Sequence, residues 1–251
     1  MNKFITASPS SKIALNMMTV SSPLPVNILI FGEAGVGKKR LIASTFPDTT
    51  SYDALELEVL FREKKVDFSK ESEIVVYHID QAGNVKQLIE QLEEEGLKII
   101  ATACEKKDVF DEKFLVKVDI TPLRERPEDT ALLVEDYVKK AKELFRIDKA
   151  LDLSLIDINL TNNSISLKES IYRSLLLASI EKKQMINVLE EFLSREIEER
   201  TDYKELLEIF EIPLLKAMRT KYKSQLQMAK KLNINRNTLR KKMYQYGLEE
   251  K

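Results

Sequence analysis

The sequence predicts an α/β domain built on a parallel β-sheet, followed by an all-helical domain at the C-terminus. Three short apolar runs rich in β-branched residues, at 26–31, 73–80 and 97–104, predict buried strands. A glycine-rich loop joins the first run directly to a helical stretch. Toward the C-terminus the charge changes as well, because residues 216–251 hold eleven Lys or Arg against two Glu.

The charge balance separates two kinds of surface. The formal net charge of the 251 residues is −1, so the strongly basic C-terminal segment is offset by an acidic remainder. A basic segment on an acidic body favours nucleic-acid binding by that segment, with double-stranded DNA as the expected partner.

Composition also excludes several classes of protein. A single cysteine excludes an internal disulfide framework and fits a reducing cytoplasm. A single histidine excludes a histidine-based zinc cluster, and we expect no structural metal. The chain has no 18-residue apolar run and no signal pattern, so we expect a cytoplasmic protein without a membrane partner.

The first elements lead into the glycine-rich loop. Residues 8–18 predict a short capped helix, with Ile13, Leu15 and Met17 or Met18 facing the core. The strand at 26–31 then runs into the loop, and the next helix begins beyond Lys38.

Strand, glycine-rich turn, lysine and helix together are typical of a phosphate-binding loop. Its glycines let successive N–H groups converge on a phosphate, while Lys38 reaches the β and γ oxygens. Lys39 stands where a hydroxyl usually holds Mg²⁺, so it either replaces the metal as counter-charge or hinders metal binding. We expect ATP or ADP and Mg²⁺ as ligands, and the alternative is a purely structural turn. The predicted nucleotide-binding residues are Gly32, Glu33, Ala34, Gly35, Val36, Gly37, Lys38, Lys39 and Asp80.

The second and third strands end in residues that bear on catalysis. Asp80 ends the second strand where P-loop enzymes hold their metal, but the next residue, Gln81, cannot accept a proton as a general base. We expect His78 to pack within the strand, with a catalytic role as the less favoured alternative. Cys104 ends the third strand and is expected to be a buried core thiol rather than a redox sensor. We therefore assign no catalytic residue beyond the metal-positioning role of Asp80.

Residues 225–243 carry a helix-turn-helix pattern. Ala229 gives the small residue that two crossing helices need, and Asn233 tolerates the left-handed conformation of the turn. The apolar residues expected on both sides of the crossing are Leu226, Leu232, Ile234 and Leu239.

The second helix of this pattern suits the DNA major groove. Asn and Arg make bidentate contacts to base edges there, while Lys and Thr reach phosphates. The alternative is a surface helix with a charged, solvated face. The predicted DNA-binding residues are Gln225, Asn235, Arg236, Asn237, Thr238, Arg240, Lys241 and Lys242.

Three segments, 28–38, 120–129 and 205–243, resemble bacterial enhancer-binding proteins of the nitrogen-regulator type. The second segment holds the run Pro122-Leu-Arg-Glu-Arg126. The resemblance implies an AAA+ domain over residues 1–146, a helical lid and linker over 147–200, and a Fis-type helix-turn-helix domain over 201–251.

The resemblance also shows where this chain departs from the family. Gln81 replaces a catalytic Glu and Cys104 a sensor Asn, Asp111 and Lys117 replace two intersubunit arginines, and Ile165 replaces a lid arginine. The loop by which the family contacts sigma-54 is missing. These departures imply little or no ATP turnover.

The implied function is therefore a DNA-binding transcriptional regulator with a degenerate AAA+ domain. We expect a homodimer on a palindromic site, paired through the helix at 206–218, with RNA polymerase or a related AAA+ regulator as a further partner. Two alternatives stay open: an active ATP-dependent sigma-54 activator, and an adaptor that co-assembles with a full-length relative.

Overall fold

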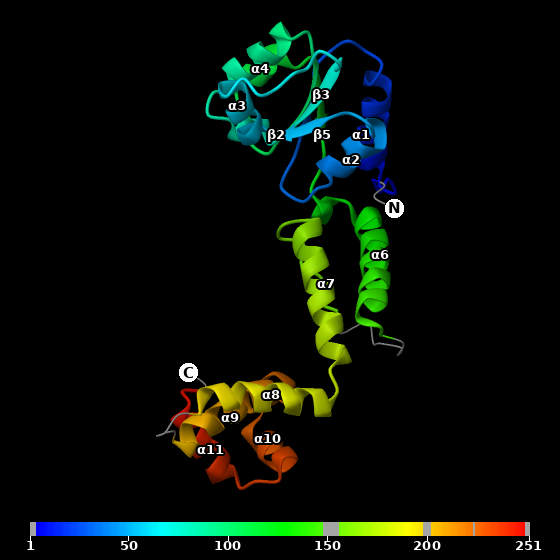
Figure 1. Cartoon of the computed structure of the whole chain (residues 1–251). Helices are drawn as coiled ribbons and strands as arrows, with labels where there is room; N and C mark the ends of the chain where they lie inside the picture. The colour runs from blue at the N-terminus through cyan, green and yellow to red at the C-terminus, as the bar shows by residue number, and fades with distance from the viewer. Residues whose placement is uncertain (1–3, 148–155, 198–201, 223, 249–251) are drawn as a thin grey trace. The chain divides into compact units, whose positions relative to one another are not determined.

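The computed structural model describes residues 4–147, 156–197, 202–222 and 224–248. The chain forms two compact units, Met1–Ser179 and Ile180–Lys251 (Figure 1), and each is described by itself. The second unit includes helix α8 (Lys182–Glu196), which precedes the boundary at residue 201 that the resemblance implied.

A five-stranded parallel sheet forms the centre of the first unit. Its strand order is β2-β3-β4-β1-β5, so β1 lies between β4 and β5. The strands are β1 (Ile28–Phe31), β2 (Ser51–Asp53), β3 (Glu73–Tyr77), β4 (Lys98–Ala103) and β5 (Val116–Asp119). The three strands predicted from the sequence are present but shorter than expected.

Helices cover both faces of the sheet (Figure 1). Along β1, Ile28 and Ile30 join one apolar cluster with residues of α1 and α2, while Leu29 joins another with residues of α3 and α4. The alternation follows from the two-residue period of a strand. These helices, with the short α5, are α1 (Pro9–Ser21), α2 (Lys38–Thr45), α3 (Ala54–Arg62), α4 (Val85–Glu94) and α5 (Val109–Lys113).

Helix α1 begins as predicted, with Ser8 as its N-cap and Pro9 in its first turn. Its predicted inner face was wrong at Ile13, whose surface is 62% exposed. The prediction is confirmed at Met18, which is buried together with Ala14, because residues four apart share one helix face.

A pair of helices completes the first unit. Helix α6 (Pro127–Phe145) packs against α7 (Ser164–Ser179), and Leu133, Leu167 and Ile171 lie in their shared core. Within the region 147–200, where a helical lid and linker was expected, residues 156–163 form no helix. Leu151, Leu153 and Leu155, which the sequence suggests as core positions of this region, lie outside the described residues.

The second unit is all-helical. It contains α8, α9 (Tyr203–Lys221), α10 (Gln225–Leu232) and α11 (Arg236–Gln245). Leu215, Met228, Ala229, Leu239 and Met243 form its core.

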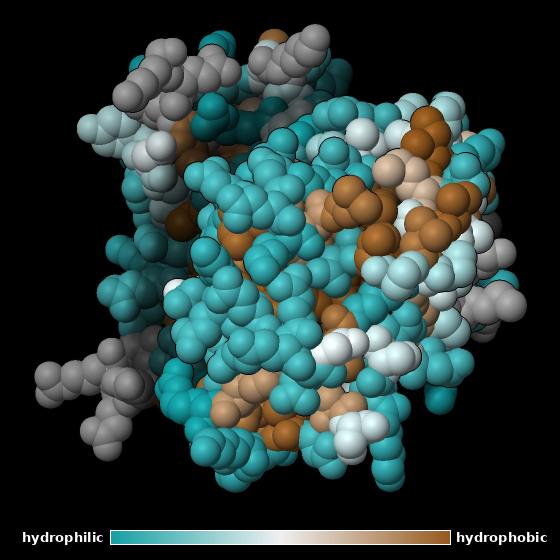
Figure 2. Space-filling model, turned by 90° about the horizontal axis from the view of Figure 1, so that it is seen from above, coloured by the Kyte–Doolittle hydropathy of each residue, from teal (hydrophilic) through white to brown (hydrophobic). Residues whose placement is uncertain are grey.

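The face that Figure 2 shows carries mostly hydrophilic side chains, with separate hydrophobic patches. Among the described residues, no helix combines the length and the apolar character that crossing a membrane would require.

Candidate functional site

The glycine-rich loop links β1 to α2 as the sequence predicted. Gly37 is the N-cap of α2 at a φ of 109°, and Gly35 has a φ of 75°, conformations that favour glycine. A Cβ at Gly35 would collide with the backbone oxygen of Asn162. The loop therefore needs glycine both for its own turn and for the close approach of residues 162–165.

Side chains hold all five backbone carbonyls of residues 32–36. Lys38 Nζ donates to the oxygens of Gly32 and Glu33, the latter at 3.0 Å, and Arg126 Nη2 donates to Val36 at 2.9 Å. Asn163 and Ser164 bind the remaining two, at 2.9 Å to Ala34 O and 2.6 Å to Gly35 O.

The N–H groups of the same loop are free of such bonds. Within the described residues, no backbone N–H of residues 33–37 donates a hydrogen bond. Since the carbonyls are fixed on one side, the N–H groups are left for a negatively charged ligand at the N-terminus of α2.

Glu33 links this loop to two distant segments. Its carboxylate accepts hydrogen bonds from Arg124 at 2.9 and 2.6 Å and from Asn163 Nδ2 at 3.0 Å. The Arg124 bonds and then the Asn163 bond lower the pKa of Glu33 to about 2. Glu33 is therefore an anion that joins the loop to the start of α7.

Asp80 and Lys38 both contact Cys104. The Oδ2 of Asp80 accepts from the N–H groups of Cys104 and Glu105, both at 2.8 Å, and Lys38 Nζ lies 3.1 Å from Cys104 Sγ. Asp80 is only 8% exposed, and its Oδ1 is buried without a partner. That oxygen is a suitable ligand for a cation, because Mg²⁺ in phosphate sites is often held by one or two carboxylates and the phosphates.

The remaining metal-binding groups are sparse. Lys39 directs its ammonium over the Tyr77 ring, 4.4 Å from the centroid, and supplies no hydroxyl. Among the described residues, no group of three His, Cys, Asp or Glu could hold a metal ion. Asp80, with its unpartnered Oδ1, is the side chain among the described residues of this site that we consider for Mg²⁺.

Two expectations about this region were wrong. His78 does not pack inside the strand: it follows β3 at a φ of 55°, is half-buried, and its Nδ1 lies 2.7 Å from Asp53 Oδ2. Cys104 is only partly buried and contacts Lys38 instead of the core. Both residues lie just beyond the end of a strand, where the chain leaves the sheet.

The other residues that the resemblance singled out lie outside the loop or at its edge. Gln81 is exposed in a 3₁₀ turn (Ile79–Gln81). Asp111 and Lys117 form an ion pair with each other. Ile165 is exposed and approaches Gly35 from the start of α7.

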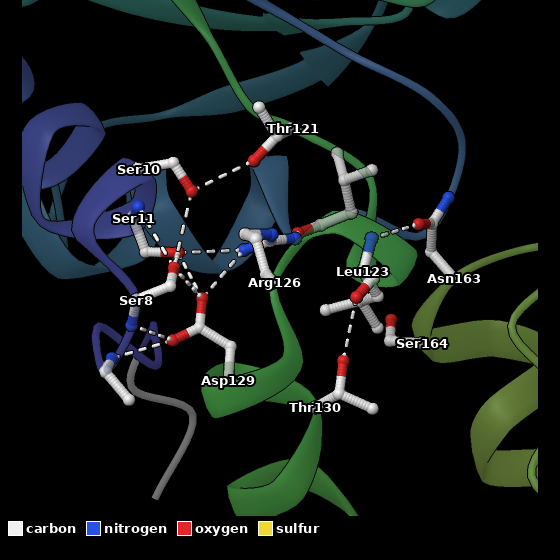
Figure 3. Close-up of polar contacts among 12 residues, drawn as sticks. Ser8, Ser10, Ser11, Thr121, Leu123, Arg126, Asp129, Thr130, Asn163 and Ser164 are labelled. Carbon is white, nitrogen blue, oxygen red and sulfur yellow. Dashed lines mark hydrogen bonds and ion pairs between the residues drawn. The ribbon is translucent and has the colours of Figure 1, made fainter.

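A buried polar cluster lies next to the loop (Figure 3). Asp129 accepts from the N–H groups of Ala7 and Ser8, at 2.7 and 2.8 Å, and also from the hydroxyls of Ser8 and Ser11. Arg126 Nη1 lies 3.2 Å from Asp129 Oδ2. Burial alone would raise the pKa of Asp129, but the serine and backbone hydrogen bonds lower it.

The side of the loop toward Gly37 is filled. A cavity of only about 20 Å³ remains there, bordered by Phe4, Ile5, Gly37, Arg126 and Leu133 among others. The Phe4 ring lies 3.0 Å from where a Cβ of Gly37 would be, and Phe4 is 4% exposed. That volume accommodates about one water molecule.

In the second unit, α10 and α11 form the predicted helix-turn-helix. Asn233 ends α10 in the left-handed conformation, at φ 53° and ψ 40°, and the Asn235 side chain caps α11 by accepting from Asn237 N at 2.8 Å. Ala229 and Leu239 are buried in the shared core as expected. The expectation for Leu226 was wrong, because it is 64% exposed.

Helix α11 buries one face and exposes another. Arg236, Thr238, Arg240 and Lys241 are exposed, and their side chains form no hydrogen bond or ion pair with another described residue. Asn237, Thr238, Arg240, Lys241 and Tyr244 border a shallow hollow of about 590 Å³. Asn235 serves as the cap, and Gln225 begins α10 half-buried.

Lys242 is placed differently from its neighbours. It forms an ion pair with Glu211 of α9, and the same carboxylate accepts from Tyr246 Oη at 2.7 Å. Burial opposes the ionisation of Glu211, but these bonds outweigh it and lower its pKa, and they raise the pKa of Tyr246 to about 12. The ammonium of Lys242 is thereby engaged within the domain.

The sequence did not point to several residues whose partners lie far away along the chain. Asn163, Arg124 and Glu211 each bind a group at least 31 residues away. The sole sequence signal was the Pro-Leu-Arg-Glu-Arg run, which contains Arg124 and Arg126.

Known structures support the fold of this chain. No protein-family model and no curated protein matches the chain. Crystal structures of NtrX from Brucella abortus are similar in structure. The complex with ADP has a TM-score of 0.57 at 16% identity, over 98% of this chain and 69% of that one. The complex with ATP has a TM-score of 0.56 at 16% identity, over 97% and 69%. The chain therefore has the AAA+-like fold of a P-loop parallel sheet with a helical lid, followed by an all-helical domain.

Proposed function

We propose that the chain is a sequence-specific DNA-binding transcriptional regulator that reads the major groove with α11. The observation that carries the proposal is the row of exposed Arg236, Asn237, Arg240 and Lys241 on a helix whose opposite face, Leu239 and Met243, is buried in the helix-turn-helix core. Because these side chains have no partners within the described residues, DNA contacts would not have to break internal bonds.

These exposed side chains, together with the exposed Thr238, suit two kinds of DNA contact. Arg236 and Asn237 lie in the first turn of α11, where recognition helices contact base edges. Thr238 and Lys241 suit phosphate contacts, which add affinity without sequence preference. Half-sites are commonly paired by two-fold symmetry, so we infer a homodimer. Exposed Phe210 on α9, with Ile186 and Val188 on α8, supports pairing through these helices.

The AAA+-like body is proposed to bind ATP or ADP as a modulator. The free N–H groups of residues 33–37 suit the phosphates, and the unpartnered Asp80 Oδ1 suits Mg²⁺. NtrX has been crystallised with ADP and with ATP, which supports this ligand class. Slow or absent hydrolysis is proposed because Gln81 provides no general base. RNA polymerase or a related AAA+ regulator is the proposed partner of the DNA-bound form.

Selection of binding sites from a pool of random DNA duplexes tests DNA recognition. The full chain should enrich a two-fold-symmetric sequence. Arg236→Ala and Asn237→Ala should each lose about 1–3 kcal/mol of discrimination at one base position per half-site. Enrichment of the same sequence at unchanged affinity by Arg236→Ala would exclude α11 as the reading element.

A separate assay addresses the active-activator alternative. The purified chain, its selected DNA, ATP and Mg²⁺ should release phosphate no faster than a Lys38→Ala control. Sustained multiple turnover that Lys38→Ala abolishes would replace the modulator role with that of a working ATPase.

A further inference from the structure

We propose that the N-terminal arm, residues 4–8, occupies the nucleoside side of the phosphate loop, so that a nucleotide must displace Phe4 in order to bind. This inference rests on the proposed phosphate-loop function. It adds a determinant of ligand class: the loop accepts a bare phosphate chain more readily than a nucleoside triphosphate.

The nucleoside of a nucleotide bound at this loop would have to lie beside Val36 and Gly37. Residues 162–165 close the loop at Gly35, and Asp80 and Cys104 lie on the side of β3 and β4. Besides Phe4, the cavity at Val36 and Gly37 is bordered by apolar Leu123 and Leu133 and by charged Arg126 and Asp129, and ligand pockets typically combine apolar walls with a few polar groups. Its volume of about 20 Å³ is far below the roughly 300 Å³ or more that small-molecule pockets provide.

Side chains of the protein itself fill this space. The Phe4 ring reaches Gly37 and belongs to the same buried apolar cluster as Val36 and Leu41, while the Phe4 N–H donates to Ser44 Oγ at 3.2 Å. The guanidinium of Arg126 is buried beside it, and its Nε has no partner among the described residues. Two groups of the chain itself therefore occupy the place of a ligand.

Contacts with helices α6 and α7 hold the arm in place. Asp129 holds the arm at Ala7 and Ser8 (Figure 3). Ile5 packs on the cluster formed by α6 and α7. Displacement of Phe4 would therefore also disturb the packing of the lid helices, which gives nucleotide binding a route to the lid.

Calorimetric titration with ATP and with inorganic tripolyphosphate tests the proposal on the full chain. The wild type should bind tripolyphosphate at least as tightly as ATP. Phe4→Ala should gain about tenfold or more in ATP affinity, with tripolyphosphate affinity unchanged, and the milder Phe4→Leu should show a smaller gain.

Phe46→Ala is the matched control, because Phe46 is equally buried in the same apolar cluster but does not border the cavity. It should leave the ratio of the two affinities as in the wild type. Tenfold tighter binding of ATP than of tripolyphosphate by the wild type, unchanged in Phe4→Ala and Phe4→Leu, would overturn the proposal. If no variant binds either ligand, the phosphate-loop function fails with it, while DNA recognition is tested independently.

Discussion

Two adjacent lysines of α11, Lys241 and Lys242, differ in their partners and therefore in their expected roles. Lys241 is exposed and free of partners within the described residues, whereas Lys242 is held by Glu211. Charge and sequence position alone predict a DNA contact for both lysines. The structure distinguishes them as a candidate phosphate contact and an internal brace.

This difference predicts opposite outcomes for two matched substitutions. Lys241→Gln should reduce the slope of log affinity for DNA against log salt concentration by about 0.9, the value for one lost phosphate contact. Lys242→Gln should leave the slope unchanged and lower the melting temperature instead. Anisotropy titrations at several salt concentrations measure the slopes, and an equal reduction by both variants would contradict the assignment.

Glu33 gives the loop a defined pH dependence. Its pKa is about 2 in the folded protein against 4.5 as the ordinary value. A carboxylate with a lowered pKa stabilises the fold fully above its unfolded value, and the contribution is lost as the pH falls toward the folded value.

The melting temperature of the wild type should therefore exceed that of Glu33→Gln at pH 6, and the difference should shrink between about pH 4.5 and 2. Glu112→Gln, an exposed carboxylate on α5, should show no such convergence. A difference between wild type and Glu33→Gln that stays constant over this range would rule out the Arg124–Glu33–Asn163 link.

Local chemistry explains which single-residue predictions succeeded. Ser8 as a cap and Asn233 at a left-handed turn depend on their immediate neighbours, and both are confirmed. Glu211, Asn163 and Phe4 act on groups brought together only by the tertiary fold, so no local pattern marks them.

Among the elements, helices and buried strands were predictable and edge strands were not. The strands β1, β3 and β4 have continuous apolar runs because both of their faces are covered. The edge strands β2 and β5 are short and include Ser51, Asp53 and Lys117, so they lack that signal. Likewise, the phase of α1 was misjudged at Ile13 because apolar residues occur on both of its faces.

Two aspartates of helix α6 should differ in how much they stabilise the fold. Asp129 at the start of the helix is fully buried and pairs with Arg126, whereas Asp136 further along is partly exposed and pairs with Lys140. Asp129→Ala should lower the free energy of unfolding by about 3–5 kcal/mol, because it leaves a buried guanidinium unpaired. Asp136→Ala should cost less than about 1 kcal/mol. Denaturant unfolding measures both, and similar small losses would show that the cluster of Figure 3 contributes little.

At the scale of the whole molecule, the acidic part of the chain is the part to which we assign nucleotide binding, and the basic C-terminal segment is the part to which we assign DNA binding. The sequence alone predicted a parallel-sheet domain with a phosphate loop and a basic helical domain, and the structure confirms this architecture. It did not predict that the loop is closed by the chain's own residues. That closure depends on Phe4, Arg126 and Asn163, which lie far apart in the sequence and meet only after folding.

The most direct test of the central claim is the ratio of two affinities of the full chain at physiological salt, measured for its selected duplex and for a scrambled duplex of equal composition. Sequence-specific reading by α11 predicts a ratio of about 10³ or more, which falls in Arg236→Ala. A ratio near one in the wild type would contradict the account and leave α11 as a charged surface helix.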